Sequence, residues 1–459
     1  MELEKTFAEI AENILELLDA KKYISARQEV LKLNAADVAE VIGDVEDEQG
    51  IENAIILFRM LPKDISAEAF SRLSTDDQLN IVAGITDREL DFIIKEMDFD
   101  DMIDVLEELP ANVVDKILVR ATKEERRQIN TFLNYPEDSA GSLMTPDYIE
   151  LRKEWTAGEA LAHIKEAGID SETVYTCYVK DPGRRLLGIV SLRSLVVSDS
   201  DTPVAEIMVE DSVYVNVSDD QEKVSAAFTK YGFLAIPVVD HEQRLVGIIT
   251  IDDILQVVEE EFTEDFERMG GVLGSDDRGY LDTGVFRQVR NRFPWLILLM
   301  CSAMVTGLVI SRFELLLTDV ASLTMYLPLL MGTGGNSGSQ ASTLVIRGLA
   351  IGELEPRDAH RVLWKEARIS FLLGVSLSLI NLAKILFIDG EPILIGLTVC
   401  VTQIFVIMLA KCIGGMLPLL AKKIGIDPAL MAAPFISTLT DTFSCLIYFS
   451  LASVIFNLY

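Results

Sequence analysis

The spacing of apolar residues divides the chain into three regions. Up to about residue 135, apolar residues recur every three or four positions, as in Ile51, Ile55 and Phe58, which is typical of amphipathic helices. From about residue 140 to 260 the pattern changes to short runs rich in β-branched residues, which favour strands. Beyond residue 293, long uncharged stretches dominate. The pattern predicts an all-α N-terminal domain, which we expect to be a superhelical stack of helix pairs, followed by an α/β domain and a membrane domain.

The membrane region contains five candidate spans. The hydrocarbon core of a bilayer is about 30 Å thick, so a helix needs about 20 mainly apolar residues to cross it. Lys384 lies inside the third stretch, where its long side chain can reach the interface. The candidate stretches are residues 293–311, 321–346, 369–388, 392–421 and 428–459. We therefore expect a five-helix α transmembrane domain.

The distribution of basic residues predicts the orientation, because Lys and Arg concentrate in cytoplasmic loops. Basic residues gather before the first span, between the second and third, and before the fifth. The connections between the first and second spans and between the third and fourth contain one basic residue, Arg312. The N-terminal MELEKTFAEI lacks a basic segment followed by an apolar run, so it resembles neither a signal peptide nor a span. We expect the N-terminus in the cytoplasm and the C-terminus outside.

Asp441 is the only charged residue in the last candidate span. It has 13 uncharged residues before it, counted from Pro428, and 18 after it, so a straight helix would place it near mid-bilayer. Intramembrane carboxylates are costly and usually mark an ion or proton path. The alternative is a structural ion pair of Asp441 with Lys411 or Lys384. Because Mg²⁺ keeps several waters and is held by one or two carboxylates, a symmetric dimer with one Asp per chain would suit it.

The second candidate span is unusually rich in small and polar residues. Residues 328–340 read PLLMGTGGNSGSQ, in which glycines such as Gly332 and Gly335 permit close helix approach. Thr333, Asn336 and neighbouring polar side chains offer oxygen ligands, so we expect this segment to line a pore. The alternative is close packing without ion contact. The segment matches neither GxGxxG nor GxxxxGK[ST], and we reject a nucleotide loop there.

The net charge of −32 lies in the first 293 residues, because residues 294–459 carry ten basic and ten acidic groups. This excess of acid favours cations and argues against nucleic acid as a partner, although solubility alone could explain it. Five cysteines without CxxC spacing and three scattered histidines indicate neither a disulfide framework nor a transition-metal site. Oxygen ligands for a hard cation remain the expectation.

The α/β region contains two corresponding segments, RLLGIVSLRS at 185–194 and RLVGIITIDD at 244–253. This tandem resembles a pair of CBS modules, which dimerise and often bind adenine nucleotides. In that family a Ser or Thr followed three residues later by Asp holds the ribose. Thr250 and Asp253 match this pattern, whereas the first copy has Ser194 in place of the acid. The resemblance implies ATP as a regulator, with Arg193 and Phe233 as further contacts.

An acidic segment with Glu259, Glu260 and Glu261 follows, and a Gly-rich break at Gly270, Gly271 and Gly274 separates it from the first span. Taken alone, it could be a solvated helix face. The whole arrangement, with GTGGN in the second span and Asp-Pro-Ala before Asp441, resembles the MgtE family of magnesium channels. The domain boundaries that we expect are 1–137 for the acidic helical domain, 138–258 for the CBS pair (142–203 and 204–258), 259–285 for a plug helix and 286–459 for the membrane domain.

The resemblance implies functional positions beyond Asp441. Asn336 would lie near the central ion site and Asp427 at the cytoplasmic mouth of the pore. One position departs from the family pattern, because Gly232 stands where members can carry an acid before the aromatic Phe233. The remaining matches are to magnesium-sensing acids: Asp100 and Asp104 of the N-terminal domain, Glu222 of the second CBS module, and Asp253, Glu261, Glu264 and Asp265, which match the sensing acids of the plug helix.

Together these features predict a homodimeric Mg²⁺ channel for magnesium uptake across the plasma membrane, the inner membrane in a bacterium. Cytosolic Mg²⁺ would bridge the acids and close it, since an ion that binds one state more tightly favours that state. Co²⁺ or other divalent cations are further candidate substrates, because a single Asp and a polar turn do not set selectivity. The alternative is a proton- or sodium-coupled transporter. We expect no enzyme, since the chain lacks HExxH and a Ser/His/Asp set.

Overall fold

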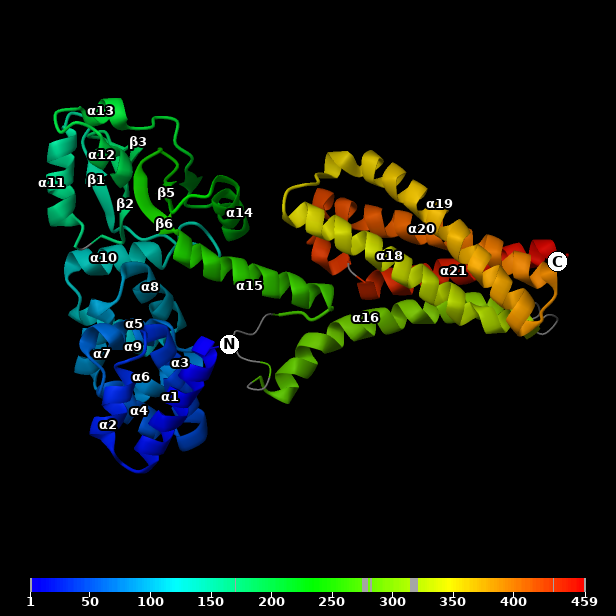
Figure 1. Ribbon diagram of the computed structural model, residues 1–459, viewed down its shortest axis with the longest axis horizontal. Helices are drawn as coiled ribbons and strands as arrows, with labels where there is room; N and C mark the ends of the chain where they lie inside the picture. Colours follow the sequence, from blue (N-terminus) through cyan, green and yellow to red (C-terminus); the bar gives the residue numbers. More distant parts are fainter. Residues whose placement is uncertain are drawn as a thin grey trace. The chain divides into compact units, whose positions relative to one another are not determined.

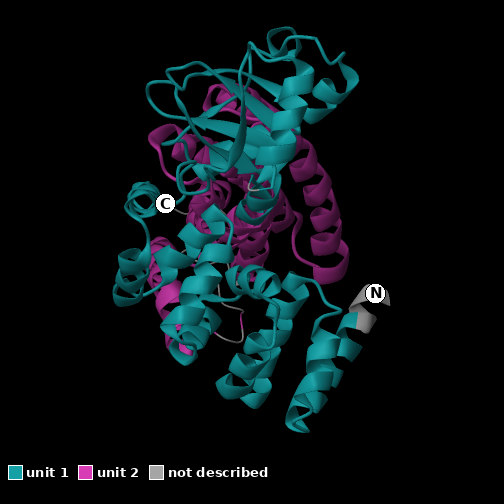
Figure 2. Ribbon diagram, turned by 90° about the vertical axis from the view of Figure 1, so that its left-hand side faces the viewer, with its two compact units in different colours: residues 1–258 teal, residues 259–459 magenta. Residues whose placement is uncertain are grey.

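The computed structural model describes residues 2–169, 171–274, 280, 283–313, 321–431 and 433–457. Parts of the predicted plug segment and of the predicted fifth span therefore lie outside the described residues. The chain forms two compact units, residues 1–258 and 259–459, which Figure 2 distinguishes by colour.

Unit 1 begins with ten helices, as the periodicity predicts. Several helices start with a Thr-x-x-Glu capping box, in which the Thr and Glu side chains satisfy free backbone N–H groups of the first turn. Thr86 with Glu89 and Thr122 with Glu125 form two of these boxes. The helices are α1 (Glu2–Asp19), α2 (Tyr23–Val30), α3 (Ala35–Gln49), α4 (Ile51–Arg59), α5 (Lys63–Ser71), α6 (Thr75–Gly84), α7 (Asp87–Glu96), α8 (Phe99–Glu108), α9 (Ala111–Arg120) and α10 (Lys123–Phe132).

Two small three-stranded sheets follow, and both have the same topology (Figure 1). In each sheet the first strand pairs in parallel with the second, and the second pairs antiparallel with the third. The first copy contains β1 (Tyr148–Leu151), α11 (Ala157–Ala167), β2 (Thr173–Lys180), β3 (Leu186–Ser191), α12 (Leu192–Val197) and α13 (Val204–Ile207). The second contains β4 (Val215–Asn216), α14 (Gln221–Tyr231), β5 (Ala235–Val239) and β6 (Leu245–Thr250). The predicted internal repeat is confirmed.

The N-terminal helices and the second sheet copy share one hydrophobic core. Buried residues from α1 to α10 are continuous with Val224, Phe228 and Ile249 of the second copy, whereas the first copy has a core of its own around Ile149 and Val179. Burial of this apolar surface is the main stabilising contribution at such an interface. It fixes α8 against the start of α15 (Ile251–Met269), the helix that continues from unit 1 into unit 2.

The helix α15 ends at Met269, well before residue 285, where we expected the plug segment to end. Gly271 and Gly274 follow with φ angles of +74° and +93°, a left-handed conformation that glycine adopts without a steric penalty. A Cβ at Gly271 would lie 2.1 Å from the Trp295 ring, so only glycine fits there.

Unit 2 also contains the long apolar helices, which run beside one another in Figure 1. They are α16 (Val285–Arg312), α18 (Leu327–Ala350), α19 (Ala359–Lys384), α20 (Ile393–Ile424) and α21 (Ala433–Ile455). Short turns flank them at Ala321–Tyr326, Pro356–Asp358, Ile385–Asp389 and Pro428–Met431.

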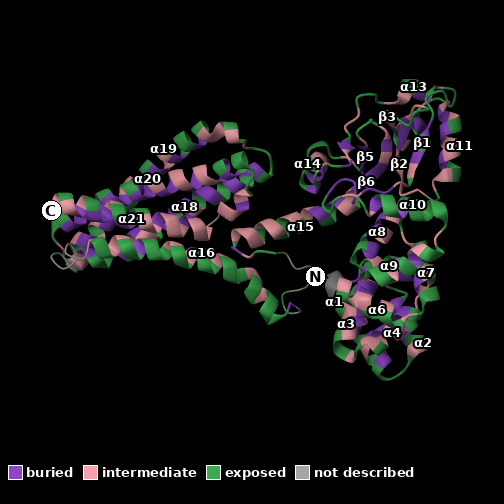
Figure 3. Cartoon of the chain, turned by 180° about the vertical axis from the view of Figure 1, so that it is seen from behind, coloured by how far each residue is buried: buried purple, intermediate pink, exposed green. Residues whose placement is uncertain are grey.

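Within the described residues, four segments are long and apolar enough to cross a membrane: Val285–Arg312, Pro356–Asp389, Ile393–Ile424 and Pro428–Ile455. The helix α18, which corresponds to the predicted second span, is not among them. Its Gly, Ser, Thr, Asn and Gln residues lower its hydropathy, although it packs against α20 and α21 along most of its length. Figure 3 shows that α20 is largely buried among the others, whereas α16 is largely exposed in the single chain.

Candidate functional site

Asp441 lies on α21 and is half-buried. On either side of Asp441, α21 packs closely against glycines of α18. A Cβ at Gly334 would lie 2.9 Å from Ser444 Oγ, and a Cβ at Gly335 would lie 3.0 Å from Ser437 Oγ. Such small-residue contacts allow two membrane helices to approach closely. The predicted polar segment and the predicted carboxylate therefore belong to one pair of packed helices.

The alternative in which Asp441 pairs with a membrane lysine is wrong for this structure. Lys411 Nζ lies 3.8 Å from Glu366 Oε2, and Lys384 Nζ lies 2.6 Å from Asp389 Oδ2. Both lysines thus have another carboxylate as partner. Among the described residues, no hydrogen bond or ion pair reaches the Asp441 side chain.

The four predicted pore-lining residues fall on different faces of α18. Gly332 and Asn336 are exposed in the single chain, together with Gln340 one turn further on. Thr333 is half-buried and donates its hydroxyl to the Leu329 carbonyl at 2.6 Å. Gly335 is buried against α21 and serves packing there. The open polar face of α18 is thus formed by Gly332, Asn336 and Gln340.

Asp427 precedes the last span and is bound from two sides. Its Oδ1 accepts a hydrogen bond from the Ala429 N–H at 2.8 Å, and its Oδ2 lies 2.5 Å from an Arg268 Nη atom. Arg268 stands in the last turn of α15 and also pairs with Glu264. Hydrogen bonding to Asp427 raises the pKa of Arg268, against the effect of burial. The end of the predicted plug helix is therefore tied to the predicted cytoplasmic mouth.

Unit 1 brings several carboxylates together where the N-terminal helices meet the CBS pair. Asp100, on α8, is 7% exposed, and its Oδ1 has no hydrogen-bond partner within the described part of the chain. Burial, and then the charges of Asp253 and Glu172, raise the pKa of Asp100 to about 9. Burial also raises the pKa of Asp253 to about 6, although Thr250 Oγ1 donates to its carboxylate at 2.5 Å. A divalent cation would relieve this repulsion.

Glu172 is a member of this cluster that the sequence did not reveal. Burial, and then the charges of Asp98 and Asp253, raise its pKa to about 7. It stands just before β2, in the helix-to-strand loop of the first CBS copy. The corresponding loop of the second copy contains Gly232 and Phe233. Aligning the two repeats would have identified this loop as a candidate site, because Gly232 departs from the family pattern at the corresponding position of the second copy.

The other predicted sensing acids lie elsewhere on the two units. Asp104 is one turn beyond Asp100 on α8 and is exposed, and Glu222 is exposed in the first turn of α14. Gly232 ends α14 with a φ angle of +66°, so its backbone conformation itself favours glycine. The three acids of the predicted plug helix, which are half-buried residues of α15 in unit 2, are Glu261, Glu264 and Asp265.

The residues predicted to bind a nucleotide are brought together only in part. Thr250 and Asp253 are hydrogen-bonded, and Phe233 stacks on Tyr231 with ring centroids 5.4 Å apart. Arg193 is exposed on α12. In the first copy Ser191 and Ser194 bond to each other through their hydroxyls at 2.7 Å, in place of the Thr and Asp pair.

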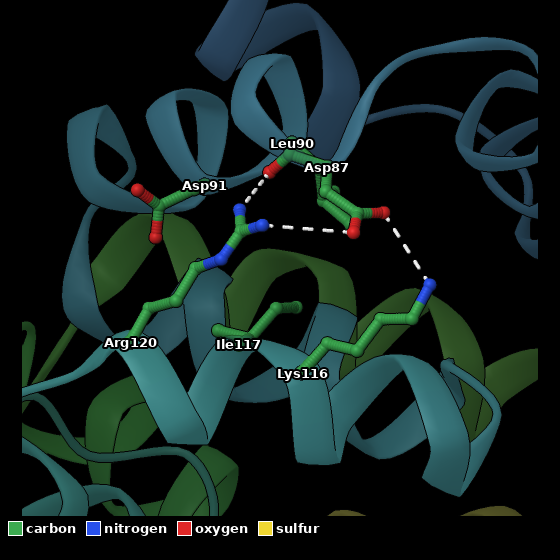
Figure 4. Close-up of a pocket in the computed structure, with 6 residues that line it drawn as sticks. All are labelled: Asp87, Leu90, Asp91, Lys116, Ile117 and Arg120. Atoms are coloured by element: carbon green, nitrogen blue, oxygen red, sulfur yellow. Dashed lines mark hydrogen bonds and ion pairs between the residues drawn. The ribbon is translucent and has the colours of Figure 1, made fainter.

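Two further observations concern ligand sites. Within the described residues, no group of three or more His, Cys, Asp or Glu side chains is arranged to hold a metal ion. A pocket between α7 and α9 is lined by Asp87, Lys116 and Arg120 among others (Figure 4). Lys116 Nζ lies 3.4 Å from Asp87 Oδ1, and Arg120 lies 3.6 Å from its other oxygen. These ion pairs join two helices and already occupy the carboxylate.

The fold is that of a protein with long apolar helices and a CBS pair, and comparison with known proteins shows that its class is that of the divalent cation transporters. Residues 327–451 match the family model for a divalent cation transporter, residues 33–138 match the MgtE intracellular N domain, and residues 140–200 and 204–260 match CBS domains. The magnesium transporter MgtE of Thermus thermophilus is 38% identical over 89% of this chain and 91% of its own length. That of Bacillus subtilis is 30% identical over 89% and 92%.

Solved structures agree with this relationship. The cytosolic domain of the Mg²⁺ channel MgtE in complex with ATP is 35% identical, with a TM-score of 0.51 over 54% of this chain and 99% of that one. The soluble part of a magnesium transporter is 29% identical, with a TM-score of 0.50 over 56% and 99%. The chain belongs to the MgtE family of magnesium transporters.

Proposed function

We propose that this protein is a Mg²⁺-selective channel that mediates magnesium uptake across the plasma membrane and that cytosolic Mg²⁺ closes. One observation carries the proposal: Asp441 has no cationic partner among the described residues, on a helix that packs against α18, while Lys384 and Lys411 each pair with another carboxylate. An unbalanced carboxylate on a membrane helix is costly unless a cation visits it. Mg²⁺ would pass as a largely hydrated ion, with carboxylate and amide oxygens contacting its water shell.

A homodimer would complete this path. The open face with Gly332, Asn336 and Gln340 has no partner helix among the described residues of the single chain. A second copy related by a two-fold axis would place the same face opposite and supply a second Asp441. Thr333 and Gly335 would then support the lining from behind. In this arrangement the N-terminus lies in the cytoplasm and the C-terminus outside.

Regulation would arise in the carboxylate cluster of unit 1. Asp100, Asp253 and Glu172 lie where the N-terminal helices meet the CBS pair, and the free Oδ1 of Asp100 is buried there. A divalent cation held by two of these carboxylates would stabilise the closed packing of the two domains. Asp104 and Glu222 would provide additional, weaker attraction for cations.

The helix α15 would transmit that change to the pore. Its first turn contains Asp253 and its last turn contains Arg268, which binds Asp427 ahead of the last span. The acids Glu261, Glu264 and Asp265 on the same helix would respond to Mg²⁺ directly. An adenine nucleotide such as ATP would reach the same switch through Thr250 and Asp253, with Arg193 and Phe233 beside it. This proposal assigns no enzymatic activity to the chain.

Patch recordings test the proposal. We expect Mg²⁺ currents that cytosolic Mg²⁺ suppresses, and a fixed proton or sodium stoichiometry would instead establish coupled transport. Replacing Asp253, Glu261, Glu264 and Asp265 by their amides should preserve conduction and weaken the inhibition by cytosolic Mg²⁺. As a matched control, four exposed acids of unit 1 can be neutralised in the same way: Glu124, Asp199, Asp201 and Glu210. Equal inhibition in both variants would contradict the assigned regulatory role.

A further inference from the structure

Unit 2 contains a pair of buried opposite charges that the proposed ion path does not use. Glu366 on α19 is 7% exposed, and Lys411 on α20 is 4% exposed. Both lie in segments long and apolar enough to span a membrane. Lys411 Nζ is 3.8 Å from Glu366 Oε2, and that oxygen has no hydrogen-bond partner within the described residues. The two charges are thus buried, but they are separated by more than hydrogen-bond distance.

The pair stands beside two glycines of α20 that lie close to α18 and α19. A Cβ at Gly415 would lie 3.3 Å from Glu366 Cγ, so the absence of a side chain there makes room for the carboxylate. One residue earlier, a Cβ at Gly414 would lie 2.1 Å from the Gly338 carbonyl oxygen of α18. The charges are therefore next to the crossing that holds the helix with the open polar face.

Stability alone explains this pair poorly. Two charges removed from water lose hydration that only a well-matched, fully hydrogen-bonded ion pair recovers, and apolar residues of similar size often replace such pairs without loss of stability. Here the separation is long and one oxygen is unsatisfied. A role for the charges themselves is the better explanation.

We infer that Glu366 and Lys411 form a charge-balanced pair that tunes the affinity of the permeation path for its cation, without contacting the ion. The inference rests on the proposed path past Asp441. At low effective dielectric a charge acts well beyond contact distance, so Lys411 alone would repel a divalent ion and Glu366 alone would retain it. When both are present, the effects of the two charges on the cation largely cancel. The carboxylate of Asp441 then remains the net charge along the path of the ion. Both are positioning residues for transport.

The two single variants should therefore have opposite effects. Glu366→Gln leaves the lysine unbalanced and should raise the half-saturating Mg²⁺ concentration of uptake by about threefold or more, the size expected for a unit charge one or two helix diameters from a divalent ion. Lys411→Met leaves the carboxylate unbalanced and should lower it by a similar factor. The double variant should lie within about twofold of the wild type. Loss of packing would instead shift both single variants in the same direction.

The experiment measures initial Mg²⁺ uptake by the full-length chain against external Mg²⁺, relative to the wild type. Val362→Ala removes packing beside Gly415 without changing charge, and it should alter the maximal rate but not the half-saturating concentration. Shifts of equal sign, or no shift in either single variant, overturn the inference. If Glu366→Gln does not accumulate in the membrane, Lys411→Met and the double variant decide it in the same way. Asp441→Asn, measured alongside, tests the path itself, because normal uptake in that variant refutes the proposed site and not the pair.

Discussion

Carboxylates of the membrane helices and of the buried cluster in unit 1 are arranged in opposite ways. In unit 2, Glu366, Asp389 and Asp427 each have a lysine or arginine within 4 Å, whereas Asp441 has no such partner among the described residues. In unit 1, burial and the charges of nearby carboxylates raise the pKa of Asp100, Glu172 and Asp253. Three membrane carboxylates are thus paired with cations, whereas the cluster of unit 1 is left unbalanced.

The difference teaches what each unit can respond to. A balanced ion pair gains little from an added cation, since its charges are already compensated. An unbalanced cluster gains much, so its conformation depends on the cation concentration. In the proposed function, the membrane helices present one unbalanced carboxylate to a passing ion, while unit 1 presents several carboxylates to a regulatory ion. Conduction and sensing would thereby be separated.

Replacing Asp441, the membrane carboxylate without a cationic partner, should have the largest effect on Mg²⁺ uptake. Asp441→Asn removes the one unbalanced membrane carboxylate while keeping its size, and we expect Mg²⁺ uptake to fall by about a hundredfold or to background, as intramembrane carboxylates usually mark the ion path. Isotope-free uptake assays in magnesium-starved cells, or currents from patches, measure this directly. The protein should still reach the membrane in normal amounts.

Asp389→Asn is the matched control, since it removes a membrane carboxylate that already has a partner. Its Lys384 is 43% exposed, so solvent can take over the compensation of that charge. We expect most of the uptake to remain. Wild-type uptake in Asp441→Asn, or equal loss in both variants, would show that the unbalanced charge is not what matters.

The second prediction concerns unit 1 and the dependence of its stability on pH. The pKa values of Asp100, Glu172 and Asp253 are raised in the folded chain to about 9, 7 and 6, so the folded state binds protons more tightly than the unfolded state over that range. The stabilisation that these three groups contribute should therefore be fully present only below about pH 4. It should be lost as the pH rises through 6, 7 and 9, by about 1 kcal/mol per pH unit for each proton that the folded state still retains. Added Mg²⁺ should flatten this fall.

In a chain with Trp295 and Trp364 replaced by Phe, the fluorescence of Trp155 alone reports thermal unfolding. Measured in metal-free buffer, the unfolding midpoint gives the dependence of stability on pH. Asp100→Asn should remove most of the slope, because it removes the proton-binding group. Glu89→Gln is a control of opposite kind. Hydrogen bonds from Thr86 and Arg59 lower the pKa of Glu89 to about 2, so its contribution is present throughout this pH range and is lost only as the pH falls below about 4. That variant should lower the midpoint equally at every pH from 6 to 9.

Much of this architecture could be predicted because it depends on local pattern. The apolar periodicity predicted the N-terminal helices, and the repeated RLLGIV and RLVGII segments predicted two equivalent sheets. The resemblance to the MgtE family is confirmed by the comparisons. Length and charge located the apolar helices, while α18 falls short on hydropathy because its polar residues face a partner or a path and not lipid alone.

What could not be predicted depends on contacts between residues far apart in sequence. Asp441, Lys411 and Lys384 were all visible as membrane charges, but nothing in the sequence assigned Glu366 to Lys411 or Asp389 to Lys384. Glu172 was missed because an acid in a loop is ordinary until folding brings it near Asp253. Arg268 was missed for the same reason, since Asp427 lies 159 residues further along the chain.

The smallest effect is expected at that contact, where both side chains remain partly exposed to solvent. Arg268 and Asp427 are 37% and 25% exposed, and exposed ion pairs contribute little, typically less than about 1 kcal/mol. Arg268→Gln should therefore raise Mg²⁺ flux at inhibiting cytosolic Mg²⁺ by only about two- to fivefold, and leave flux at low Mg²⁺ unchanged. Arg357→Gln, which disrupts an exposed pair with Glu355, should change neither. An unaltered inhibition curve for Arg268→Gln would mean that the contact between α15 and the last span does not help to hold the proposed channel closed. The Arg268–Asp427 ion pair would then have no part in the gating.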